Sequence, residues 1–74
     1  MAHPIEHVAN SLVRLYRDQR AALLLPIGVI RDRLERRIAW TLETMPTGWK
    51  QTGESVLEMA VNGEEWEPAE WVTA

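Results

Sequence analysis

The chain contains no cysteine and only two histidines, His3 and His7. Without cysteine, no disulfide stabilises the fold, and a thiolate metal site or a cysteine nucleophile is excluded. The two histidines are four residues apart, so they would share one face of a helix, but no H-E-x-x-H pattern and no third ligand accompany them. We therefore expect no metal site and no cofactor.

Motifs for catalysis and phosphate binding are also missing. Neither Ser11 nor Ser55 lies in a G-x-S-x-G segment, and there is no glycine-rich phosphate loop. Six glutamates follow residue 50, but they are spread over a segment that we expect to be exposed. That distribution is typical of a solvated surface rather than of an acid–base site. These absences predict a protein that is not an enzyme.

Long apolar runs are absent as well. The longest, residues 21–30, is interrupted by Pro26 and Gly28 and is much shorter than the ~20 residues of a membrane span. The N-terminus lacks the basic region and apolar core of a secretory signal. The sequence therefore predicts a cytoplasmic protein with no membrane partner.

Basic residues are missing from the last third of the chain. Residues 51–74 contain six glutamates and no lysine or arginine, whereas residues 1–50 contain all eight basic and five acidic residues. These two segments carry net charges of −6 and +3, which give the overall charge of −3. Such an asymmetry can steer a partner, but we favour ordinary solvation and charge complementarity between two parts of one fold.

Two amphipathic helices are predicted at about residues 4–24 and 26–45. Pro26 cannot lie inside a helix without removing a hydrogen bond, so it separates the two and can begin the second. So short a link predicts an antiparallel helical hairpin, with one kinked helix over residues 4–45 as the alternative. The second helix has apolar residues at steps of three and four on one stripe, which we expect to be buried: Ile27, Ile30, Leu34, Ile38, Leu42 and Met45.

A β-hairpin is predicted for about residues 54–68. Leu57, Met59 and Val61 alternate with polar or small residues as in a half-buried strand, and Asn62-Gly63 is a strong signal for a two-residue turn. The alternative is a short helix from Ser55 that ends at Gly63. The predicted fold class is therefore α+β, with a helical hairpin followed by a β-hairpin in a single small domain of residues 1–74.

The first helix has an apolar face that covers about half of its circumference, wider than one partner helix requires. At 74 residues the core is near the lower limit for an independent domain, and neither disulfide nor metal is available to stabilise it. We therefore predict a homodimer whose interface combines residues of both helices: Ile5, Val8, Leu12, Leu15, Ile30 and Leu34.

One flank of the second helix carries residues that its apolar stripe does not need. Val29, Arg33, Arg36 and Trp40 recur at steps of four, three and four. Tryptophan and arginine are enriched at the energetic centres of protein interfaces, so we predict that these four residues bind a partner. The remaining tryptophans are expected to lie in the core or to pack against it: Trp49, Trp66 and Trp71.

Taken together, these features predict a small non-enzymatic interaction protein that binds another protein and modulates it, most simply by inhibition. Chains of this size and composition are common among bacterial and phage regulators, which is an analogy and not a motif match. The alternative is a small dimeric DNA-binding regulator, because Arg33, Arg36 and Arg37 can face a groove. The net negative charge weighs against it. A subunit of a larger enzyme is a third class.

Overall fold

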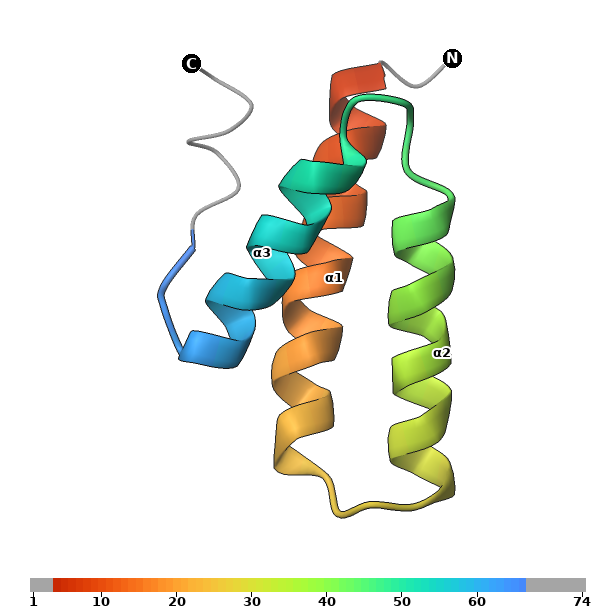
Figure 1. Cartoon of the computed structure of the whole chain (residues 1–74), viewed down its shortest axis with the longest axis vertical. Coiled ribbons are helices and arrows are strands. Elements are labelled where there is room, and N and C mark those ends of the chain that lie inside the picture. The colour runs from red at the N-terminus through yellow and green to blue at the C-terminus, as the bar shows by residue number, and fades with distance from the viewer. Residues whose placement is uncertain (1–3, 67–74) are drawn as a thin grey trace.

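The computed structural model describes residues 4–66, which form three helices. They are α1 (Pro4–Leu24), α2 (Val29–Glu43) and α3 (Lys50–Asn62). Helices α1 and α2 run antiparallel, and α3 crosses α1 obliquely (Figure 1). Helix α1 packs against both α2 and α3, whereas α2 and α3 contact each other only slightly. The described part of the chain is therefore a helical bundle with α1 as its common element.

The link between α1 and α2 contains Pro26, as the sequence predicts, but α2 begins at Val29 rather than at residue 26. Gly28 is the residue before the helix, and its carbonyl accepts the first helical hydrogen bond from the backbone N–H of Asp32 at 2.9 Å. The guanidinium of Arg31 donates to the carbonyl of Leu25 at 3.3 Å and so ties the link to the first turn of α2.

The prediction of a β-hairpin over residues 54–68 is wrong for the part that the structure describes, since residues 50–62 form α3 and residues 4–66 contain no strand. Its last two residues lie outside the described range. The reason lies in which residues are buried. Helix α3 buries Gly53, Val56 and Ala60, at steps of three and four. Two of these have little or no side chain, so an apolar-pattern search overlooks them. The fold class is helical, not α+β.

The Asn62-Gly63 pair does not form a hairpin turn. It ends α3, as the alternative interpretation of a short helix that stops at Gly63 predicted. Gly63 has φ 74° and ψ 19°, the left-handed conformation. The N–H groups of Gly63 and Glu64 donate to the carbonyls of Ala60 and Met59 at 3.3 and 3.0 Å. These two bonds form a Schellman motif, which satisfies carbonyls that the helix end leaves without partners. The helix begins at Lys50, earlier than the expected Ser55.

Replacing Gly63 with valine is expected to lower the free energy of unfolding by about 1–2 kcal/mol, because β-branched residues strongly resist positive φ. Space is not the problem, since a Cβ at this position would lie 3.5 Å from the Nη1 atom of Arg20, an ordinary contact. Gly63→Asn should cost less, since asparagine tolerates this conformation. Thermal unfolding followed by circular dichroism measures both, and equal losses for the two variants would contradict the conformational explanation.

The core lies where α2 and α3 meet α1. Leu12, Leu15 and Val56 are the largest fully buried side chains, and Val8, Ala22, Ile38 and Met45 complete the buried cluster. The wide apolar face of α1 therefore has two neighbours within its own chain. The second neighbour, which the sequence analysis assigned to another copy, is α3.

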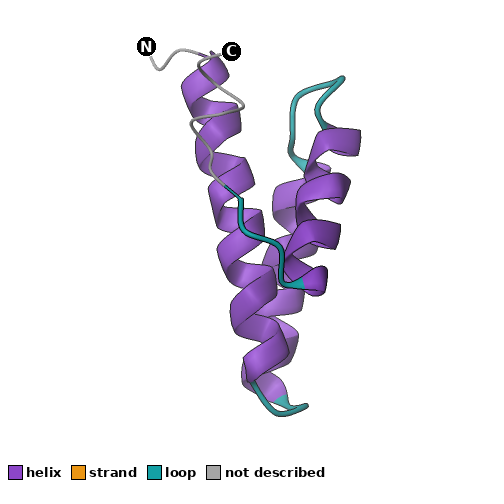
Figure 2. Ribbon diagram, turned by 90° about the vertical axis from the view of Figure 1, so that its left-hand side faces the viewer, coloured by secondary structure: helices purple, strands orange, loops and turns teal. Residues whose placement is uncertain are grey.

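Residues 64–66, which follow α3, run back toward α1 (Figure 2). The hydroxyl of Tyr16 donates to the backbone carbonyl of Glu64 at 2.5 Å. The rings of Tyr16 and Trp66 lie with their centroids 5.6 Å apart, tilted by 40°. As predicted, Trp49 and Trp66 pack against the core, both partly buried, while Trp71 lies outside the described residues.

Candidate interaction surface

The four residues predicted to bind a partner lie together on the exposed side of α2. Val29 and Trp40 are 68% and 62% exposed, and Arg33 and Arg36 are exposed as well. At 100° per residue they fall within an arc of about 60°. The buried residues of this helix, Ile38 and Thr41, lie on the other side. We call these four residues the α2 contact face.

The two arginines of the α2 contact face are not engaged in ion pairs or side-chain hydrogen bonds within the described chain. Within residues 4–66, neither Arg33 nor Arg36 forms an ion pair or a side-chain hydrogen bond. The neighbouring arginines differ: Arg31 bonds Glu35 one turn away at 3.2 Å, and Arg37 bonds α1. Within the 60° arc there is no carboxylate, so the face is positively charged between two apolar ends.

A buried carboxylate on α1 forms an ion pair with α2. Asp18 is 7% exposed and accepts two hydrogen bonds from Arg37, at 2.8 Å from Nε and 2.6 Å from Nη2. The hydrogen bond and the negative charge of Asp18 raise the pKa of Arg37 above its usual value. Because the folded pKa of Arg37 is raised, the stability that its charge contributes is fully present below the ordinary arginine pKa and is lost only as the pH rises through the raised value. This bidentate pair joins α2 to α1 on the same side as the buried residues Ile38 and Thr41.

The sequence analysis did not single out Asp18 or Arg37 as partners, so it missed this pair. Two residues 19 positions apart on different helices share no local pattern, so only the packing of α1 against α2 reveals the contact.

Some of the residues predicted to form the dimer interface are buried within the chain, and others are exposed. Val8, Leu12 and Leu15 are buried by the chain's own helices, so they have no exposed surface to offer a second copy. Ile30 is 67% exposed and Leu34 is partly buried. The side chain of Ile5 lies outside the described part of the molecule. The predicted combination of α1 and α2 residues is therefore not one accessible surface.

A second apolar surface lies at the α1–α2 link. Leu24 and Ile27 are 87% and 90% exposed, and Ile30 adds to them. Ile27 and Ile30 were expected in the buried stripe of the helix predicted for residues 26–45. They are exposed because α3 ends before it reaches this end of the bundle (Figure 1). Beside it, a shallow hollow of about 190 Å³ is lined by Arg20, Leu23, Leu24, Ala60, Val61 and Gly63.

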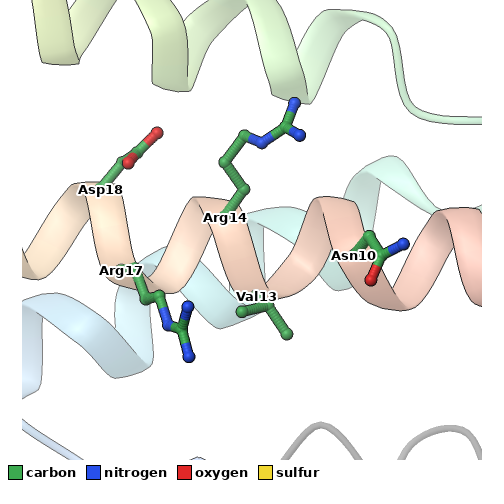
Figure 3. Close-up of a pocket in the computed structure, with 5 residues that line it drawn as sticks. All are labelled: Asn10, Val13, Arg14, Arg17 and Asp18. Carbon is green, nitrogen blue, oxygen red and sulfur yellow. The ribbon is translucent and has the colours of Figure 1, made fainter.

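The hollow along α1 offers no convergent chemistry. It measures about 340 Å³ and is lined by Asn10, Val13, Arg14, Arg17 and Asp18. In Figure 3, Arg14 and Asp18 point toward α2, whereas Val13 and Arg17 point to the other side of the helix. Since Asp18 is engaged by Arg37, these polar groups do not meet around a common ligand position.

Residues 4–66 contain no group of three or more histidine, cysteine, aspartate or glutamate side chains placed to hold a metal ion. None of the three helices has the length and apolar character required to cross a bilayer.

The glutamates of α3 make no ion pairs with the arginines of α1 and α2 in the described part. The bridge that reaches α3 joins Lys50, at its first position, to Glu43 of α2 at 3.5 Å. Glu54 and Glu58 are exposed and lie outside every bridge within residues 4–66. The expected charge complementarity between the two parts of the chain is therefore not realised as ion pairs within the described molecule.

No protein-family model, curated protein or solved structure matches this chain. Its function is therefore inferred from its own surfaces.

Proposed function

We propose that this chain is a non-enzymatic interaction protein whose α2 contact face binds another protein and modulates it. The observation that carries the proposal is the exposure of Trp40, 62%, beside two arginines that form no intramolecular ion pair in the described chain. A tryptophan in water exposes a large apolar area that binding can bury. Arginine adds directional bonds at an interface, and a rigid helix lowers the entropic cost of presenting both.

The chemistry of the α2 contact face defines the partner. Arg33 and Arg36 require carboxylates or other anionic groups opposite them. Val29 and Trp40 at the two ends require apolar contacts, and a tryptophan binds best in a pocket that excludes water. The partner surface is therefore acidic at its centre and apolar at its ends, about as long as three turns of helix. Binding covers that surface of the partner, so other molecules can no longer reach it. This is the simplest route to inhibition.

Replacing Trp40 or Arg36 with alanine is expected to weaken partner binding by about 1–3 kcal/mol each, with little change in melting temperature. Both side chains point away from the core, so their loss leaves no cavity. Controls exist on α1, where Arg17→Ala removes an exposed arginine and Leu24→Ala removes an exposed apolar side chain outside the α2 contact face.

The measurement begins with affinity capture from the native host, followed by calorimetric titration of the captured protein with each variant. Melting temperatures are recorded alongside. A drop in melting temperature for Trp40→Ala without loss of affinity would show that the face is architecture and not a binding site. If the captured ligand is duplex DNA, and the logarithm of its affinity falls steeply with the logarithm of salt concentration, the DNA-binding alternative replaces the proposal.

A further inference from the structure

The outer side of α3 has the opposite charge from the α2 contact face. Gln51, Glu54, Glu58 and Val61 are all exposed and fall within an arc of about 80° at 100° per residue. The residues that α3 buries, Gly53, Val56 and Ala60, lie on its other side. No lysine or arginine belongs to this arc. We call these four exposed residues the α3 acidic face.

The two faces match in spacing as well as in charge. Steps of four, three and four separate Val29, Arg33, Arg36 and Trp40, and steps of three, four and three separate Gln51, Glu54, Glu58 and Val61. At 1.5 Å per residue, the two arginines are about 4.5 Å apart along their axis and the two glutamates about 6 Å. Two packed helices can therefore place both arginines opposite both glutamates. In one direction Val61 meets Trp40, and in the other it meets Val29.

The two faces do not meet within one chain. Each points away from α1, against which both helices pack, and no bridge within residues 4–66 joins them. Figure 1 shows α2 and α3 diverging as α3 descends from the loop that joins them. A contact between the faces therefore requires two molecules. Pairing of two α2 contact faces is disfavoured, because an antiparallel arrangement would set Arg33 against Arg36 of the other copy.

We infer that the α2 contact face of one copy binds the α3 acidic face of a second copy. The inference rests on the proposed function, since it assigns to that binding face a partner surface that meets most of the stated requirements: it is acidic at its centre and apolar at one end, Val61, while the other end is the polar Gln51. The contact is heterologous, because different surfaces of the two copies meet, so it repeats head to tail or closes into a ring. A stronger acidic partner competes with self-association for the same α2 residues.

The test uses variants that each disable one face. Arg33→Glu with Arg36→Glu reverses the α2 contact face, and Glu54→Gln with Glu58→Gln neutralises the α3 acidic face. All four side chains are exposed, so circular dichroism should show intact folding. We expect the wild-type mass to rise with concentration in low salt and to fall as salt is added. Each double variant should weaken self-association at least about tenfold.

A mixture of the two variants gives the sharpest result. The variant with Arg33→Glu and Arg36→Glu retains only a working α3 acidic face, and the variant with Glu54→Gln and Glu58→Gln retains only a working α2 contact face. Together they should therefore form a one-to-one pair that does not associate further. Sedimentation velocity measures the masses. A wild-type protein that stays monomeric in low salt at the highest attainable concentration would overturn the inference. Self-association that neither variant weakens would overturn it as well.

Failure of this inference can be told apart from failure of the proposed function. The variant with Glu54→Gln and Glu58→Gln keeps the α2 contact face, so under the proposed function it should bind the captured partner at least as tightly as wild type. A monomeric wild type that still loses the partner on Trp40→Ala would overturn self-association alone. Self-association as expected, with partner binding unaffected by Trp40→Ala, would support the inference and refute the proposed function.

Discussion

Replacing Leu15 with alanine is expected to lower the free energy of unfolding by about 3–5 kcal/mol. Leu15 has no exposed surface and lies in the buried cluster where α1 meets the other helices. The loss combines the transfer of the missing methyl groups with the cavity that remains. A domain of this size, with no disulfide, is expected to have a total stability near the lower end of about 5–15 kcal/mol. This one substitution should therefore leave a substantial fraction of molecules unfolded at room temperature.

The matched control is Leu24→Ala, which removes the same atoms from a position that is 87% exposed. Its effect should stay within about 0.5 kcal/mol. Urea unfolding monitored by circular dichroism gives both values. Similar losses for the two variants would show that Leu15 is not the centre of a packed core, and would call the arrangement of α3 over α1 into question.

The contrast between these two leucines shows what the sequence can predict. Val8, Leu12 and Leu15 recur at steps of four and three, so the periodicity of α1 identifies its buried face. The periodicity does not say what covers that face. A second copy and a third helix satisfy the same pattern, and the choice between them depended on the structure of residues 50–62.

That segment was misjudged because its signals are ambiguous. The pair Asn62-Gly63 provides a residue that tolerates positive φ, and both a tight hairpin turn and a helix end use such a residue. The alternation of Leu57, Met59 and Val61 favoured a strand, although the residues that α3 buries are Val56 and two small ones, Gly53 and Ala60. Glycine and alanine carry little weight in a hydrophobic pattern, yet they allow two helix backbones to approach closely.

Some features of the candidate surface could be predicted from the sequence and others could not. The exposure of Trp40 followed from its position outside the apolar stripe of α2, since that is a property of a single helix. The exposure of Ile27 and Ile30 did not follow, because it depends on where α3 ends relative to the α1–α2 link. The Asp18–Arg37 pair likewise requires the relative placement of two helices. Features of one element could be predicted, and features of the packing between elements could not.

Replacing Gly53 with leucine should lower the free energy of unfolding by about 2–3 kcal/mol, because this glycine is where α3 packs closely against the helical hairpin. A Cβ placed on Gly53 would lie 2.8 Å from Cδ1 of Leu42, 2.9 Å from Sδ of Met45 and 3.2 Å from Cδ1 of Leu15. The tips of these side chains can shift to admit one carbon atom, but not a whole leucine side chain. The intrinsic gain of about 1 kcal/mol from replacing glycine in a helix works against this loss and does not cancel it.

Gly28→Leu is the control, since nothing lies within 4 Å of a Cβ there and its φ of 165° is extended backbone. Thermal unfolding of both variants gives the comparison. If Gly53→Leu were as stable as Gly28→Leu, then α3 would not pack on α1 and α2 through Gly53.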